Sequence, residues 1–392
     1  MKKKHQLGLI WRVLIAIALG ILCGQFVPGW FVQIFETFNK LFGQLISFCV
    51  PLIILALITA AIADTRNGAG RMLVYTLCLA YLSTIVVGFI AYFTGNAIFP
   101  KIIAPGAAMA EMAEAPEFPP YFTINVPPVM DVLSALVLAV ILGLGILRTQ
   151  SETLHRVACE LREIIMFAIA KAIVPLLPVY VFGIFLNMTS TGTVITVIGV
   201  FIKVIGVVFV LHVLWLVLLY LIAGALGKVN PFKALATMLP AYLTALASSS
   251  SAATIPVTLR QAKKLGVDER VADFTIPLCA NIHLSGSSLK VISFALAVMI
   301  MQGMHYDFGL FATFIMLLGI TIVAAPGVPG GVIMAALSVL SSVLGFGDAE
   351  NALMISLYIA VDSFGTACNV TGDGALTLIV NRLVHGRSAD SQ

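Results

Sequence analysis

The stretch Asp362-Ser-Phe-Gly-Thr-Ala-Cys-Asn-Val-Thr-Gly-Asp373 lies inside an apolar segment that runs from Ala352 to Val384. Four of its polar residues are four, three and four positions apart and therefore share one narrow stripe of an α-helix: Asp362, Thr366, Asn369 and Asp373. Burying an ionised carboxylate in a membrane costs at least roughly 2.5 to 3.5 kcal/mol, so such residues normally face a cavity and bind something. The alternative is a polar interface between packed helices.

The whole chain is more apolar than a soluble protein. Of its 392 residues, 60% are hydrophobic and 10% are charged, whereas about a quarter of the residues in soluble domains are charged. The apolar runs are continuous, which favours membrane-spanning helices over the alternating strands of a β-barrel. The formal net charge of +4 reports membrane orientation and does not point to a nucleic-acid partner. We therefore predict an all-α polytopic membrane protein.

Six apolar runs of spanning length precede residue 228. They lie at about 7–27, 38–63, 72–98, 130–147, 158–187 and 193–226. A cytoplasmic N-terminus, with Lys2 to Lys4, also places Arg66 and Arg71 in the cytoplasm. The acidic loop near Glu114 then lies outside, so the charges obey the positive-inside rule.

The next apolar run, Ala234 to Leu259, has basic residues on both flanks. A single crossing would place one of these flanks on the wrong side of the membrane. Pro240 and the serine run Ser248-Ser-Ser-Ser251 also interrupt a straight helix. We therefore predict a re-entrant helical hairpin at about 231–260, which enters from the cytoplasm and turns at the serines.

A second interrupted run, Phe308 to Leu344, is flanked by acidic residues, and its middle reads Ala324-Ala-Pro-Gly-Val-Pro-Gly-Gly331. We predict a second hairpin at about 308–345 that enters from outside. Spans at 274–301 and 352–384 then give eight transmembrane helices plus two re-entrant hairpins, with both termini cytoplasmic. Two broken segments of opposite orientation are typical of transporters built from inverted repeats, and their tips mark the binding site.

The seventh span carries polar residues at every second position: Asn281, His283, Ser285 and Ser287. This period does not fit one face of a helix, so it predicts a locally unwound span whose carbonyls can coordinate Na⁺. His283 is either a hydrogen-bonded buried imidazole or a proton-coupling group. Lys290 needs a partner in the membrane, and the candidates are Asp362 and a substrate carboxylate.

Several motifs resemble those of the glutamate-transporter-like family of dicarboxylate/amino acid:cation symporters: Asn369-Val-Thr-Gly-Asp373, Thr254-Ile-Pro256 after the serine run, Pro277-Leu278, and Gly327-Val-Pro-Gly330. The resemblance implies a homotrimer with a glutamate-transporter-homologue fold. Residues 1–71 and 99–192 would form a static scaffold, with the extracellular loop inside the second range. Residues 72–98 and 193–392 would form a transport domain that moves across the membrane like an elevator.

The resemblance also implies a substrate site. Asp362 matches the residue that holds the substrate ammonium, and Asn369 matches the one that holds its α-carboxylate. The remaining substrate-site positions are two hydroxyl-bearing residues and the two hairpin tips: Thr366, Ser287, Ser250, Ser251, Gly327 and Val328. Asp373 matches a sodium ligand, and the candidate cation site also takes backbone positions around the break in the seventh span and on the stripe: Cys279, Asn281, His283, Leu284 and Asn369.

Two departures from the family pattern bear on the substrate and the ions. Gly365 stands where the acidic-substrate members carry an arginine that pairs with a side-chain carboxylate. Ser285 stands where they carry a carboxylate of one sodium site, so we predict fewer coupled sodium ions. Ser83 and Thr84 are remnants of that site in this interpretation.

We therefore expect an integral protein of a bacterial inner (plasma) membrane that takes up a small neutral amino acid with Na⁺, or alternatively with H⁺. The second hypothesis is uptake of an acidic amino acid or C4-dicarboxylate, with Lys290 replacing the missing arginine as a point charge. Two hairpins that close over a site disfavour a channel or receptor. An enzyme is disfavoured because the serine run lacks a paired general base. We expect membrane lipids as neighbours, no cofactor and no nucleic-acid partner.

Overall fold

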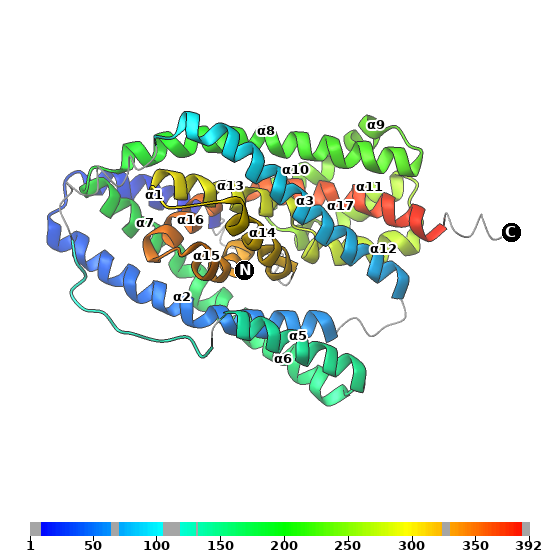
Figure 1. The fold of residues 1–392 in the computed structure, drawn as a ribbon, viewed down its shortest axis with the longest axis horizontal. Helices are drawn as coiled ribbons and strands as arrows, with labels where there is room; N and C mark the ends of the chain where they lie inside the picture. Colours follow the sequence, from blue (N-terminus) through cyan, green and yellow to red (C-terminus); the bar gives the residue numbers. More distant parts are fainter. Residues whose placement is uncertain (1–8, 64–69, 105–117, 131, 324–329, 386–392) are drawn as a thin grey trace, which may run out of the picture.

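The computed structural model describes residues 9–63, 70–104, 118–130, 132–323 and 330–385. These residues form helices, most of them joined by short connections, and 118–130 run without regular structure before α5. The described part of the chain contains no β-strand. The prediction of an all-α protein is confirmed. In Figure 1, α8 runs along the upper edge of the molecule, α2 and α5 lie toward the lower edge, and α13 and α17 lie between them.

The first half of the chain forms long helices: α1 (Leu9–Gly24), α2 (Gly29–Ala63), α3 (Gly70–Ile102), α5 (Val132–Thr149), α6 (Glu152–Ala168), the π-helical turn η2 (Ile169–Ile173), α7 (Val174–Ser190) and α8 (Val194–Gly227). The helix α2 begins well before the expected start near residue 38. Hydropathy missed this first part, 29–37, because it contains Gln33 and Glu36. Lys40 follows within the predicted run. It pairs with Asp348, at 2.7 Å between Nζ and Oδ2.

The second half is divided into shorter helices: α9 (Pro231–Thr237), α10 (Leu239–Ser248), α11 (Ser251–Lys264), α12 (Glu269–Ile282), α13 (Ser285–Met301), α14 (Phe308–Val323), α15 (Gly331–Leu344), α16 (Asp348–Ala360) and α17 (Asp362–His385). The breaks fall where the sequence predicted them for the serine run and the seventh span. Ser249 has a positive φ of 52°, and His283 and Leu284 leave the helical conformation. The middle of the second predicted hairpin, 324–329, lies outside the described residues.

One break was not predicted. The last apolar segment, expected as one span, is bent by 64° between α16 and α17. Val361 lies at this bend and is followed at once by Asp362, the first residue of α17. All four residues of the polar stripe therefore belong to α17, and most residues of this helix are buried.

Among the described residues, four helices are long and apolar enough to cross a membrane, or five if α16 and α17 form one bent span. The predicted number of eight spans and the re-entrant path of the hairpins stay predictions. Large apolar side chains are exposed along α5 and α8, including Ile141, Ile195, Ile202 and Val213. Such a surface is stable in lipid, because hydrocarbon tails are as apolar as these side chains.

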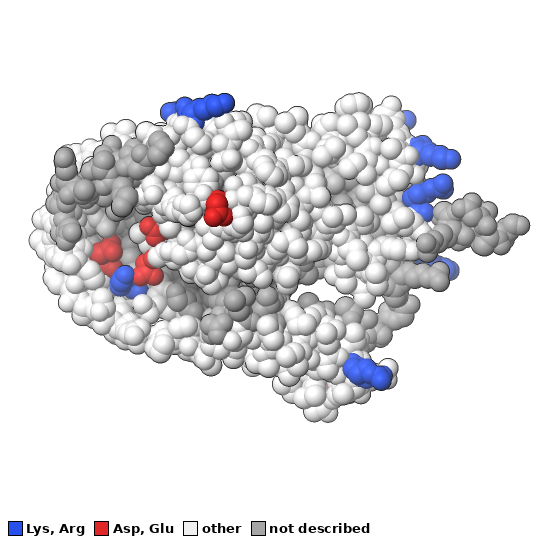
Figure 2. Space-filling view, in the orientation of Figure 1, with Lys and Arg blue, Asp and Glu red and all other residues white. Residues whose placement is uncertain are grey.

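Charge is distributed unevenly along the molecule. On the face in Figure 2, several Lys and Arg side chains lie at the end where α9, α11 and the C-terminus lie in Figure 1, and others lie in the opposite half, at its upper edge and beside acidic side chains. The Asp and Glu side chains visible on this face lie in the other half of the molecule. The cytoplasmic location of the end that carries α9 and α11 stays a prediction.

Candidate functional site

The centre of the candidate site is the contact between α13 and α17. Every residue of α13 is buried, and the helix packs against α3, α8 and α17. The helices α10, α11 and α12 also pack against α17. The polar stripe of α17 therefore faces protein on several sides, and its carboxylates need partners within the protein.

Asn369 joins the stripe to the start of α13. Its Oδ1 accepts hydrogen bonds from the backbone N–H groups of Gly286, at 2.8 Å, and Ser287, at 3.2 Å. Its Nδ2 donates to Ser287 Oγ at 2.9 Å. The first N–H groups of a helix have no partner within that helix, so Asn369 acts as a cap supplied by another helix.

Asp362 lies between α13 and the start of α15. Its Oδ2 accepts from the backbone N–H of Gly330 at 2.9 Å. Its Oδ1 lies 3.3 Å from Lys290 Nζ. The carboxylate is thus neutralised by a lysine from α13 and hydrogen-bonded to the segment that leads into α15. One of the two partners that the sequence offered for Lys290 is therefore present.

Lys290 is fully buried, and three groups suited to a cation surround its ammonium. These are the Asp362 carboxylate, the Val361 carbonyl oxygen at 3.3 Å, and the face of the Tyr358 ring, whose centroid lies 3.7 Å away. Gly365 makes this position accessible. A Cβ at residue 365 would lie 2.5 Å from Lys290 Cε and 2.8 Å from Nζ.

A second polar chain lies on the same face of α17. His283 Nδ1 is 2.8 Å from Asp373 Oδ1, and His283 Nε2 is 2.9 Å from Ser83 Oγ on α3. Both the imidazole and the carboxylate are buried. Gly372 permits this approach, because a Cβ there would lie 2.7 Å from His283 Cε1. The break after α12 therefore carries an imidazole that links α17 to α3.

Of the other residues predicted to bind the cation, Cys279 and Leu284 lie next to His283 in the break between α12 and α13, and Asn281 points elsewhere. The Cys279 carbonyl accepts from the His283 N–H at 2.8 Å, and the Leu284 carbonyl accepts from Ser288 N–H at 2.9 Å. Asn281 is exposed and donates to the Pro277 carbonyl of its own helix at 3.0 Å. The structure thus does not bring the Asn281 side chain to Asp373.

Sequence reasoning missed the residues that α8 contributes. Trp215 Nε1 donates to Ser285 Oγ at 3.1 Å, and His212 Nε2 lies 2.9 Å from the Gly286 carbonyl oxygen. Tyr220 donates from its hydroxyl to the Thr371 carbonyl at 2.8 Å. His212 could have indicated this contact from the sequence, because it lies within the predicted span 193–226, where an imidazole needs a polar partner.

The serine turn lies beside α17 through the packing of α10 and α11. Ser250 caps α11, because its hydroxyl accepts from Ala253 N–H at 3.3 Å. Ser251 is buried at the first position of α11. Thr366 is also buried, and its hydroxyl donates back to the Asp362 carbonyl at 3.0 Å. Gly327 and Val328 lie outside the described residues.

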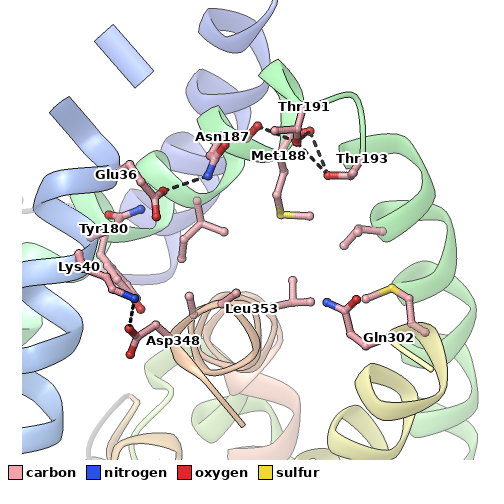
Figure 3. Close-up of a pocket in the computed structure, with 16 residues that line it drawn as sticks. Glu36, Lys40, Tyr180, Asn187, Met188, Thr191, Thr193, Gln302, Asp348 and Leu353 are labelled. Carbon is pink, nitrogen blue, oxygen red and sulfur yellow. Dashed lines mark hydrogen bonds and ion pairs between the residues drawn. The ribbon is translucent and has the colours of Figure 1, made fainter. Parts of the chain in front are cut away.

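A cavity of about 220 Å³ lies elsewhere, between α2, α7 and the start of α8 on one side and α13 and α16 on the other (Figure 3). Glu36 accepts a hydrogen bond from Asn187 Nδ2 at 2.9 Å in this cavity. Lys40 pairs with Asp348 at one side of the cavity. None of the predicted site residues that the structure describes lines this cavity.

Comparison with known proteins is consistent with this geometry. The sequence profile of the sodium:dicarboxylate symporter family matches residues 9–383. The chain is similar to the serine/threonine transporter SstT of Lacticaseibacillus casei (strain BL23), with 27% identity over 394 residues, 95% of this chain and 88% of the relative. It is also similar to SstT of Streptococcus thermophilus (strain LMG 18311), with 26% identity over 396 residues and 96% of each chain. The chain therefore belongs to the sodium:dicarboxylate symporter family, which makes it a membrane transporter and not an enzyme.

Proposed function

We propose that this protein takes up a small neutral amino acid together with sodium. The substrate ammonium binds at Asp362 and its carboxylate at Asn369. The observation that carries the proposal is the packing of Lys290 against Gly365, which leaves no space for the arginine of acidic-substrate members. The names of the two serine/threonine transporters support a substrate with a neutral side chain.

Uptake of labelled serine, threonine and alanine into proteoliposomes tests this proposal. We expect accumulation that requires an inward sodium gradient and that unlabelled serine inhibits. Uptake that is indifferent to sodium and to pH contradicts cation coupling. Uptake of aspartate or succinate, with serine and alanine as poor inhibitors, contradicts the proposed substrate class.

A second candidate substrate is an acidic amino acid or a C4-dicarboxylate that pairs with Lys290. It is favoured by the position of the Lys290 ammonium beside Gly365. It is disfavoured by the three partners that this ammonium already has within the protein. Lys290→Ala distinguishes the two candidates, because loss of aspartate or succinate uptake is expected only for the second.

We further propose that the transport domain moves relative to a static scaffold. In support, α1, α2, α5 and α7 pack mainly with one another, while α10 to α13 pack around α17. The scaffold is 1–71 and 99–192, and the moving part is 72–98 and 193–392. Hairpin tips at Ser250 and Ser251, and at Gly327 and Val328, close over the substrate. A homotrimer with cytoplasmic termini belongs to the same proposal.

Sodium binds, in this proposal, at Asp373 with backbone carbonyls near the break between α12 and α13. Asp373 has the charge that a sodium site requires, and the carbonyl oxygens of Cys279 and Leu284, which accept one hydrogen bond each, keep a second lone pair for a cation. Ser285, which replaces a charged ligand in the family pattern, receives a hydrogen bond from Trp215. Fewer sodium ions than in acidic-substrate members are therefore coupled to each substrate.

A further inference from the structure

The ion pair between Lys290 and Asp362 occupies the position proposed for the substrate ammonium. Both carboxylate oxygens of Asp362 already have partners, namely Lys290 Nζ at 3.3 Å and the Gly330 N–H at 2.9 Å. One carboxylate charge balances only one of two buried ammonium charges, so an amino acid that binds Asp362 through its ammonium competes with Lys290 for Oδ1. The substrate and the lysine compete for one carboxylate.

The displaced ammonium has a position to which it can move. The Val361 carbonyl oxygen and the Tyr358 ring face already contact Lys290 Nζ, at 3.3 Å and at 3.7 Å from the ring centroid. Neither group belongs to the proposed substrate contacts. A short shift of Nζ toward these two groups frees Asp362 Oδ1 while the lysine stays solvated by protein.

A carrier that catalyses net uptake must return without substrate after each delivery. A buried carboxylate without a counter-ion strongly disfavours that step, because it leaves an uncompensated charge in a medium of low dielectric constant. We propose that Lys290 is a tethered counter-ion, which neutralises Asp362 whenever the substrate leaves and thereby lets the empty carrier return without a cation carried in the opposite direction. This inference rests on the proposed binding of the substrate ammonium at Asp362.

The position of Lys290 beside Asp362 depends on Gly365. Because a Cβ at this position would lie 2.5 Å from Lys290 Cε, a larger residue displaces the lysine stem from its place beside Asp362. Gly365 and Lys290 therefore depend on each other. The glycine supplies the space, and the lysine supplies the charge in that space.

Two transport assays separate the return of the empty carrier from all other steps. Net uptake of labelled serine into vesicles without internal serine requires that return. Exchange of labelled external serine for unlabelled internal serine does not require it. In Lys290→Gln, we expect the ratio of net uptake to exchange to fall by about tenfold or more. Internal ammonium ions, which can neutralise Asp362 without a tether, are expected to restore the ratio.

Lys203→Gln is the matched control, since Lys203 lies in the long apolar helix α8 but is exposed and donates to the Ile102 carbonyl. Its ratio is expected to equal that of the wild type. Gly365→Ala provides a second variant if Lys290→Gln does not fold, and its ratio is expected to fall in the same direction.

An unchanged ratio in Lys290→Gln overturns the inference, and so does a wild type that only exchanges. A fallen ratio that internal ammonium does not restore also overturns it, because the lysine then acts by positioning other groups. If Lys290→Gln does not fold, an unchanged ratio in Gly365→Ala is decisive against it. A wild type that transports no amino acid in either assay contradicts the proposed function itself.

Discussion

Single side chains in this protein satisfy groups that belong to other helices. Asn369, from α17, accepts from Gly286 and Ser287 of α13 and donates to the Ser287 hydroxyl. Buried polar groups are costly when they lack partners. Residues of this kind therefore hold two helices in one arrangement and orient the site at the same time.

Asn369→Ala should destabilise the protein, because it leaves two buried N–H groups and the Ser287 hydroxyl without this partner. We expect a loss of at least about 1 to 3 kcal/mol, the cost of leaving one such buried group unpaired. Thermal unfolding of the purified protein in detergent measures it. Asn281→Ala is the control, since Asn281 is exposed and bonds to its own helix, and it should shift the unfolding temperature little. Equal shifts contradict the capping role.

Asp373→Asn should weaken sodium binding, because it removes the negative charge of the proposed cation site. We expect the sodium concentration for half-maximal serine uptake to rise by about tenfold, the usual order for loss of one favourable charge contact. Sodium titration of uptake is the measurement. Asp307→Asn, an exposed aspartate at the start of α14, should leave the titration unchanged. An unaltered curve for Asp373→Asn excludes this carboxylate as a sodium ligand.

Among the elements, the sequence predicted the helix breaks that have a local cause. The serine run and the alternating polar residues around His283 identified the ends of α10 and α12. The bend at Val361 has no Gly or Pro at the bend itself. Lys290, distant in sequence, donates to the Val361 carbonyl, which also accepts from the Phe364 N–H, and Asp362 begins the next helix. A tertiary contact of this kind has no local signal.

The residues of the candidate site also fall into those with a local sequence signal and those placed by tertiary packing. The stripe on α17 and its likeness to the family motif identified Asp362, Asn369 and Asp373, because helical periodicity is a local property. The partners of these residues were only partly predictable. Lys290 was suspected as a partner of Asp362, but Trp215 and the bond from His283 to Ser83 depend on how α8 and α3 pack.

Ser250→Ala should loosen the start of α11, because the Ser250 hydroxyl accepts from the Ala253 N–H. Loss of an N-cap typically costs about 0.5 to 2 kcal/mol. Hydrogen exchange at residues 251–254 should accelerate, while exchange in α12 and α13 stays unchanged. Thr244→Ala is a suitable control, since Thr244 is half-buried and its hydroxyl donates back to the Pro240 carbonyl within α10. Unchanged exchange at the start of α11 contradicts the cap.

For the whole molecule, the contact between Lys40 of α2 and Asp348 of α16 joins the two proposed domains. The contact borders the cavity shown in Figure 3. Both side chains are partly exposed, so the ion pair contributes little stability. The Lys40–Asp348 pair can be used to detect motion between the domains, because it must separate if α16 moves and α2 does not.

Cysteines at residues 40 and 348, in a variant without the native cysteines, should be linked by mercuric ions and should stop serine uptake. A thiol reductant should restore it. Cysteines at Lys263 and Asp273, which pair at 3.0 Å between α11 and α12, lie within the proposed transport domain. Their link should leave uptake intact. Uptake that survives the 40–348 link contradicts motion of α16 relative to α2.

The complete burial of α13 also has a consequence for biosynthesis. Asp362, Val361 and Tyr358, the partners of Lys290, are all translated after this helix, and so is α17, which covers one side of it. When α13 leaves the ribosome, its lysine has none of these partners. Insertion of α13 must therefore be completed late, after the last helix has been synthesised, and a chain that ends before residue 362 keeps its central helix in an unfinished state.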